Sequence, residues 1–350
     1  MKPTRLILSI DGGGTRGIIP ATILAMLENK LGKPCNQIFD LIAGTSTGGI
    51  IALALAAGVK ARAVQELYLD KADDIFNDDF WDNLRDGFGK NLGADYKQDK
   101  LKRILQGIIG DLTMGDVHES SKNSSHPFTV MVPTFDLSPE KDMTKMDRNY
   151  RPKIFTSFHS HDFSARLVDI ACATSAGPTY FPIFKSPDKN LPGSYIDGGV
   201  AINHPAMSAL AMAVNEESGL GWPIGECRVL SLGTGTSNTN WFDRNKIGDG
   251  DWGNMQWVKY LPDLLVESNI QASEYYVRQM IPNCNNNYRR IQHDLSNLPG
   301  ARGKTIGMDT VKREILEAMQ HKAITYFNDA ANQQELIDFV EMKEMAPLLV

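Results

Sequence analysis

Short apolar runs alternate with helical patterns in the N-terminal part of the chain. Residues 5–10 form an apolar run that ends at an aspartate and three glycines, which predicts a buried strand followed by a loop. Apolar residues then recur at helical spacing over residues 18–31. Residues 39–43 predict a second short buried strand, and residues 50–57 predict a helix of small residues.

The order strand, helix, strand, helix is typical of a layered α/β fold. We therefore predict a three-layer α/β/α sandwich with a mostly parallel central sheet. Further strands are expected at residues 128–135 and 228–232, and the clearest later helices at residues 206–214 and 311–327. No repeat, low-complexity tract or convincing linker divides the chain, so a single domain over residues 1–350 is the simplest interpretation.

The composition is that of an ordinary globular protein. Of the 350 residues, 42% are hydrophobic and 22% are charged, which excludes wholesale disorder, collagen and coiled coil. The formal net charge of −6 argues against broad electrostatic binding to nucleic acid, although it leaves room for a local basic patch. The four cysteines lie far apart, so we expect a cytoplasmic protein with neither a disulfide framework nor a clustered metal site.

One uncharged stretch, residues 41–59, is long enough to span a bilayer. A polar turn at residues 44–49 divides it, and a buried strand, a sharp turn and a buried helix explain it better. The first apolar run is too short for the core of a signal peptide. We therefore expect a soluble chain that touches membranes only at their surface.

The polar turn carries the first catalytic pattern. Residues 44–48 read GTSTG and match the G-x-S-x-G nucleophile elbow, between a predicted strand and a predicted helix. A serine at such a turn has a strained backbone, so Gly44 and Gly48 are needed because a bulkier residue would not fit. The N-terminus of the following helix would stabilise negative charge that develops at the site. The pattern predicts that Ser46 is a nucleophile.

A glycine-rich loop follows the first strand. Residues 11–17 read DGGGTRG, and successive glycines let backbone N–H groups point into one concavity that binds an anion. The anion could be a nucleotide phosphate or the oxyanion of an acyl-transfer intermediate. The dinucleotide fingerprint fits Gly12, Gly14 and Gly17, but the next strand does not end in the acidic residue that would bind a ribose. The neighbouring serine motif favours acyl transfer.

The third pattern is Asp197, followed by two glycines at residues 198–199. Another segment can approach a carboxylate on such a turn closely, so Asp197 could take the proton of Ser46 directly. Taken alone, the pattern would be explained better by a plain structural turn.

In this order, the motifs resemble those of the patatin-like phospholipase family, in its compact bacterial form. The resemblance rests on residues 11–17 with Pro20, on residues 44–49, on Asp197 with its glycines, and on ATSAGP at residues 173–178. It covers about residues 5–236. It implies a Ser–Asp dyad in which Ser46 attacks an ester carbonyl and Asp197 acts as the general base.

The resemblance also implies supporting roles. The amides of Gly12, Gly13 and Gly14 would form the oxyanion hole, and Arg16 would brace the glycine loop or, as a second choice, meet a phosphate. The implied substrate is a phospholipid or another acyl ester, with transient contact to a membrane surface. Neither a metal nor a cofactor is implied, and the oligomeric state stays open.

One departure from the family opens a rival mechanism. The family commonly has Asn-Asn-Pro after the aspartate turn, whereas this chain has Asn203, His204 and Pro205. A histidine there invites a Ser–His–Asp triad, and the alternative is that His204 only packs. Another alternative is a signalling effector whose lipase activity is switched by a small molecule, although no motif identifies the site of such a regulator.

After residue 236 the resemblance fades. We expect residues 237–350 to add an aromatic loop and two C-terminal helices that pack on the core. Trp241, Phe242, Trp252 and Trp257 lie in that loop, where they could guide acyl chains, touch a bilayer or cluster with one another.

Overall fold

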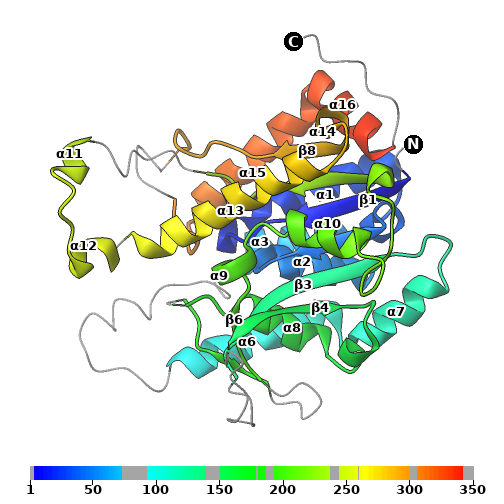
Figure 1. The fold of residues 1–350 in the computed structure, drawn as a ribbon, viewed down its shortest axis with the longest axis horizontal. Helices are drawn as coiled ribbons and strands as arrows, with labels where there is room; N and C mark the ends of the chain where they lie inside the picture. The colour runs from blue at the N-terminus through cyan, green and yellow to red at the C-terminus, as the bar shows by residue number, and fades with distance from the viewer. Residues whose placement is uncertain are drawn as a thin grey trace.

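The computed structural model describes residues 4–72, 93–138, 150–178, 180–186, 193–236, 244–258, 260–299 and 306–341. Within these ranges helices cover both faces of a central sheet (Figure 1). Trp241 and Phe242 of the predicted aromatic loop lie outside the described residues. The predicted α/β class with a mostly parallel central sheet is confirmed.

The parallel part of the sheet is built around β1 (Arg5–Ile10). On one side β1 pairs with β2 (Leu41–Gly44), which pairs with β3 (Thr129–Asp136). On the other side it pairs with β7 (Cys227–Leu232), which pairs with β8 (Tyr288–Ile291). The sequence patterns located the first four of these strands to within two residues and missed β8. Because all five run the same way, their carboxyl ends meet at one edge of the sheet.

The strand β3 brings an antiparallel segment to this edge. One side of β3 pairs with β4 (Arg151–Thr156) along residues 131–136. The other side is shared: β2 pairs with residues 129–131 and then ends, and β6 (Ser194–Asp197) pairs with residues 134–136. The short β5 (Phe184–Lys185) extends the sheet beyond β6. The end of β6 therefore lies beside the end of β2.

The two faces of β1 explain the two helical layers. Leu6, Leu8 and Ile10 point into the larger core, whereas Ile7 points into a second core, because successive strand residues face opposite ways. The larger core includes α1 (Ile18–Leu31), α2 (Thr47–Ala56), α3 (Ala61–Asp70), α8 (Leu167–Thr174), α15 (Arg313–Asn328) and α16 (Ala330–Val340). The second lies under α10 (Ala206–Val214) and α13 (Leu261–Met280), which cross the front of the sheet in Figure 1.

The other α-helices of the described ranges are α6 (Gly93–Ile109), α7 (Met114–Lys122), α9 (Gly199–Ile202), α11 (Arg244–Ile247), α12 (Asn254–Val258) and α14 (Cys284–Asn287). Among the described residues no helix is both long and apolar enough to cross a membrane. The uncharged stretch at residues 41–59 forms β2, a sharp turn and the buried α2, as its pattern predicts.

Candidate active site

Ser46 occupies a strained turn between β2 and α2. Its φ of 55° and ψ of −123° lie in a region that residues other than glycine rarely adopt. The turn is tight on both sides: a Cβ on Gly44 would lie 2.0 Å from the Gly48 carbonyl oxygen, and a Cβ on Gly48 would lie 2.3 Å from that of Ile10. An added Cβ at either residue would therefore clash with the backbone of the turn or of β1.

The side chain of Ser46 points to Asp197. Ser46 Oγ donates a hydrogen bond to Asp197 Oδ2 at 2.6 Å. The Ser46 amide donates to Thr174 Oγ1 at 3.0 Å, and Thr174 in turn donates to the Pro133 carbonyl at 2.6 Å. Thr174 thereby connects the serine turn to β3, the strand that also holds Asp197 in register.

Asp197 is the last residue of β6 and pairs with Thr134 of β3. Its second oxygen, Oδ1, accepts a hydrogen bond from the Gly199 amide at 2.7 Å, which fixes the carboxylate plane. Burial raises the pKa of Asp197 to about 6, against the opposing effect of the hydrogen bonds from Ser46 and Gly199. The carboxyl group can therefore accept and release a proton close to neutral pH.

The glycine loop lies against this pair. A Cβ on Gly12 would lie 3.2 Å from the Ser46 Cβ, so the loop and the serine are in close contact. Gly14, with φ of 58°, begins a short 3₁₀ turn at residues 14–17. The amides of Gly13 and Gly14 have no hydrogen-bond partner within the described part of the chain. As far as the chain is described, they are unpaired donors in the loop that packs against Ser46.

Gly12 differs from the sequence expectation. Its amide donates to the Asn203 carbonyl at 3.1 Å, so it is already engaged and is not a free oxyanion donor. Its carbonyl accepts from Thr234 Oγ1 at 2.9 Å. A Cβ on Gly12 would lie 2.2 Å from Asn203 Oδ1, which explains the glycine by close packing. Gly12 anchors the loop, and the expected set of three amides is reduced to two.

Arg16 is held inside the protein. Its Nε donates to the Gly13 carbonyl at 3.3 Å and its Nη1 to the Gly235 carbonyl at 3.4 Å. Only 8% of the residue is exposed, and burial lowers the pKa of its guanidinium. These contacts are those of a brace for the glycine loop, and such a buried side chain is poorly placed to meet a phosphate.

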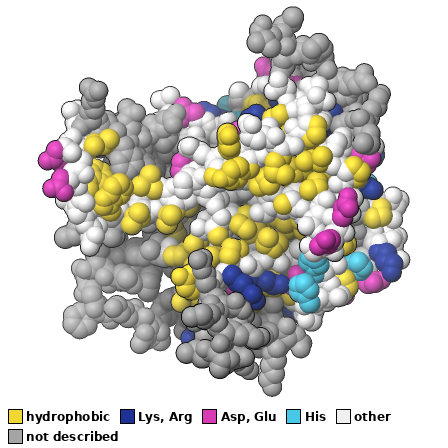
Figure 2. All heavy atoms as spheres, viewed as in Figure 1, with side chains coloured by type: hydrophobic (Ala, Val, Ile, Leu, Met, Phe, Trp, Pro, Cys, Tyr) yellow, Lys and Arg dark blue, Asp and Glu magenta, His cyan; other side chains and the backbone are white. Residues whose placement is uncertain are grey.

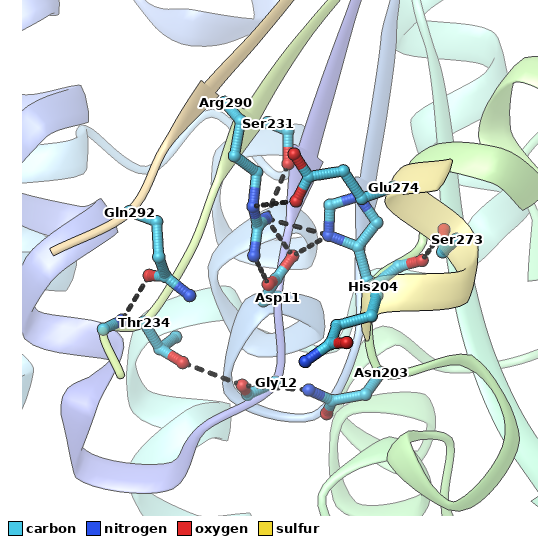
Figure 3. A network of polar contacts seen from close by, with 12 residues as sticks. Asp11, Gly12, Asn203, His204, Ser231, Thr234, Ser273, Glu274, Arg290 and Gln292 are labelled. Atoms are coloured by element: carbon cyan, nitrogen blue, oxygen red, sulfur yellow. Dashed lines mark hydrogen bonds and ion pairs between the residues drawn. The ribbon is translucent and has the colours of Figure 1, made fainter. Parts of the chain in front are cut away.

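His204 is engaged away from Ser46. Its Nδ1 lies 2.8 Å from Asp11 Oδ1 (Figure 3). Its Nε2 lies 3.3 Å from the Tyr288 hydroxyl. A proton on Nδ1 would donate to Asp11 and leave Nε2 to accept from the tyrosine. Both ring nitrogens are thus occupied, and the residue is 1% exposed. The geometry contradicts a Ser–His–Asp triad through His204, because neither nitrogen is available to Ser46.

The sequence patterns assigned no role to several residues that support the site. Thr174, Asn203 and Thr234 each bond to the serine turn or the glycine loop, and Arg290 binds Asp11. Thr174 and Asn203 lie within or beside recognised motifs, so their position was a usable signal. Thr234 follows β7 and Arg290 lies in β8, at the same edge of the sheet as the glycine loop. Only the order of the strands in the sheet reveals that these two residues reach the loop.

Comparisons with known proteins show the family to which the chain belongs. A sequence model of the family described as patatin-like phospholipase matches residues 8–210. Patatin-like protein 2 of Arabidopsis thaliana is 33% identical over 327 residues, covering 82% of this chain and 75% of the relative. Patatin group A-3 of Solanum tuberosum is 27% identical over 374 residues, covering 96% and 89%. A cGAMP-activated phospholipase of Pseudomonas aeruginosa is 31% identical over 293 residues, covering 83% and 78%.

The matched region contains the glycine loop, the serine turn and Asp197, and it spans more than half of the chain. The relative from Arabidopsis thaliana extends the similarity to most of the chain. The chain therefore belongs to the patatin-like phospholipase family.

Proposed function

We propose that this protein is a serine lipid acyl hydrolase that releases fatty acids from glycerophospholipids or related acyl esters. Membership of the family supports lipid acyl hydrolase activity in general. The observation that carries the more specific proposal is the 2.6 Å hydrogen bond from Ser46 Oγ, on a strained turn, to Asp197 Oδ2. Such a pair is the minimum needed to activate a serine hydroxyl.

In the first half of the reaction, Asp197 removes the proton of Ser46 while Oγ attacks the ester carbonyl carbon. The carbonyl oxygen becomes an oxyanion, and the amides of Gly13 and Gly14 donate hydrogen bonds to it. Loss of one such donor costs about 3–4 kcal/mol of transition-state stabilisation in comparable sites. The protonated Asp197 then gives its proton to the leaving alcohol, and the acyl group stays on Ser46.

In the second half, water attacks the acyl-enzyme. Asp197 takes a proton from this water, and the same two amides hold the second oxyanion. Collapse returns the proton to Ser46 Oγ and releases the fatty acid. The pKa of Asp197, raised to about 6, suits a group that must be a base at the start of each half and an acid at its end.

We further propose that the enzyme meets its substrate at a membrane surface from the cytoplasm. Hydrophobic side chains gather over α12 and the first half of α13 on the face shown in Figure 2. In these two helices Trp257, Leu261 and Leu265 are 41%, 42% and 55% exposed. Helix α13 is joined to the site, because Asn269 bonds to the Ala201 carbonyl in α9. Exposed apolar side chains beside an ester-cleaving site favour contact with lipid.

A second candidate is a lipase that a small molecule switches on. The observation that favours it is the similarity to the Pseudomonas aeruginosa protein that is described as cGAMP-activated. The test is phospholipid hydrolysis with and without cGAMP. An increase in rate that requires Ser46 supports this candidate, and an unchanged rate over a full titration removes it.

The central test compares Ser46→Ala with Ser175→Ala. Ser175 is a buried serine that bonds to the Ala171 carbonyl beside the site, so it controls for loss of a nearby hydroxyl. We expect Ser46→Ala alone to abolish release of fatty acid from a mixed phospholipid extract, measured by mass spectrometry. It should also lose labelling by a fluorophosphonate while its circular dichroism stays unchanged. Retention of most activity in Ser46→Ala would remove the proposal.

A further inference from the structure

A buried ion pair lies directly before the glycine loop. Asp11 follows β1 and precedes Gly12, and its side chain is 1% exposed. Arg290 donates to both carboxylate oxygens, from Nη2 to Oδ2 at 2.6 Å and from Nη1 to Oδ1 at 3.0 Å (Figure 3). A bidentate pair of hydrogen bonds of this kind fixes the orientation of the carboxylate as well as its position.

Arg290 reaches Asp11 from two strands away. It lies in β8, and β7 separates that strand from β1. In register, Arg290 is beside Ser231 of β7, which is beside Ser9 of β1. These small side chains leave room for the guanidinium to cross the sheet, and the Ser231 hydroxyl accepts a hydrogen bond from Arg290 Nη1 at 2.7 Å. The serine row is what lets an arginine on an outer strand reach the glycine loop.

The segment after α9 holds Asp11 and Gly12 together. His204 Nδ1 bonds to Asp11 Oδ1, and the carbonyl of the preceding Asn203 accepts from the Gly12 amide. The His204 carbonyl in turn accepts from Ser273 Oγ of α13 at 2.8 Å. Arg290 and His204 therefore hold the side chain of Asp11, and Asn203 holds the backbone of Gly12.

Asp11 is not suited to act as a general acid or base. Although burial alone would raise its pKa, the neighbouring Arg290 and His204 lower it below the ordinary value, so the carboxylate stays ionised. Both oxygens are occupied by these partners. Within the described ranges Asp11 belongs to no cluster of residues that could hold a metal ion. What remains for this buried charge is to hold the backbone that follows it.

We propose that Arg290 is a positioning residue for acyl transfer: it holds Asp11 so that the amides of Gly13 and Gly14 face the oxyanion beside Ser46. Two peptide bonds connect Asp11 to Gly13, so a shift of the carboxylate moves the donors. A displacement of about 1 Å at a catalytic group can lower the rate about 100-fold. This inference rests on the proposed function and adds the residue that sets the geometry of the oxyanion hole.

The test uses Arg289 as the matched control. Arg289 is the neighbouring residue in β8 and points to the opposite face, where it forms an ion pair with Glu335 of α16 and bonds to Tyr326. Arg289→Ala and Arg290→Ala thus each remove one strand arginine with a carboxylate partner. Only Arg290→Ala removes a contact with the glycine loop. A loss of rate caused by general destabilisation would therefore appear in both variants, whereas a loss that acts through the loop would appear in Arg290→Ala alone.

Two measurements report on the oxyanion hole. One is kcat and KM on a water-soluble p-nitrophenyl ester, and the other is the rate of Ser46 phosphonylation by a fluorophosphonate, whose P=O oxygen occupies the oxyanion position. We expect Arg290→Ala to lower kcat and the labelling rate together by about 100-fold, with KM nearly unchanged. Arg289→Ala should stay close to wild type. Guanidinium at non-denaturing concentration should restore part of the lost rate in Arg290→Ala.

If Arg290→Ala does not fold, Arg290→Lys carries the test, because lysine keeps the charge but cannot bind both carboxylate oxygens. A folded Arg290→Lys with wild-type kcat and labelling rate overturns the inference, as does an equal loss in Arg289→Ala. Activity that persists in Ser46→Ala overturns the proposed function instead. Inactive Ser46→Ala together with fully active Arg290 variants overturns this inference alone.

Discussion

Ser46 Oγ and Asp197 Oδ2 lie 2.6 Å apart although 151 positions separate the two residues in the chain. The strand before Ser46 is β2, and the strand that ends at Asp197 is β6. Both pair with the same side of β3. Because β2 stops at Gly44, β6 can continue along β3 and end beside the serine turn. The contact thus depends on the length of β2 as well as on the two side chains.

The hydrolysis rate should rise with pH as Asp197 loses its proton. The pKa of this carboxyl is raised to about 6, and only the ionised form can accept the proton of Ser46. We expect kcat/KM on a p-nitrophenyl ester to increase between pH 5 and 7, with a midpoint of about 6. The labelling rate of Ser46 should follow the same curve. A midpoint near pH 4 would contradict the assignment.

Asp197→Asn should be inactive yet more stable than the wild type at pH 8. A native pKa of about 6 against 3.8 for the ordinary carboxyl means that the native state disfavours the charge. This unfavourable contribution is complete above pH 6 and disappears as the pH falls to about 4. We expect the free energy of unfolding to rise by about 2 kcal/mol at pH 8.

The measurement is urea unfolding of Asp197→Asn and wild type at pH 8 and pH 4, with the exposed Asp251→Asn as control. The gain should be confined to Asp197→Asn and should shrink at the lower pH. A gain that is equal at both pH values would show that it does not come from ionisation of Asp197.

Replacement of Ser46 by glycine should be more stable than replacement by alanine. The φ of 55° at this position is strained for any residue with a Cβ, whereas glycine adopts it freely. We expect Ser46→Gly to exceed Ser46→Ala by about 1 kcal/mol in free energy of unfolding. Both should be inactive. Equal stability of the two variants would indicate that the turn relaxes at little cost.

Gly48→Ala should disrupt the site, whereas a glycine-to-alanine change at an uncrowded position should be harmless. A Cβ at residue 48 would lie 2.3 Å from the Ile10 carbonyl oxygen, so β1 and the serine turn would have to move apart. Gly107, in α6, has open space around the added Cβ and serves as the control. We expect lost activity and a lower Tm for Gly48→Ala. Gly107→Ala should keep its activity and gain about 0.5–1 kcal/mol of stability.

His204→Ala should lose stability without losing catalysis altogether. His204 is 1% exposed, and its imidazole bonds to Asp11 and Tyr288. Removal of the ring therefore leaves buried polar groups with fewer partners. We expect a cost of about 2 kcal/mol in the free energy of unfolding. The residual kcat should lie far above that of Ser46→Ala at a temperature where both are folded. If the two variants are equally inactive, a triad describes the enzyme better than a dyad.

Local patterns were sufficient for the elements that flank the glycine loop and the serine turn. The strand at residues 5–10 and the helix at residues 18–31 have the predicted bounds, because a short apolar run that stops at an aspartate and a regular helical spacing leave few alternatives. The turn around Ser46 was predictable for a steric reason, since only glycine fits at residues 44 and 48. β8 was missed, because Arg289 and Arg290 make its sequence look like a surface segment.

The sequence by itself determined that the serine and the glycine-rich loop each follow a strand, since these motifs and their flanking elements are local features. Tertiary structure alone decided which polar groups were already taken. The Gly12 amide is bound by Asn203, His204 is bound by Asp11, and Arg290 arrives from β8. The physical reason is that a buried donor or acceptor must find a partner, and that partner is set by the packing of segments distant in the chain.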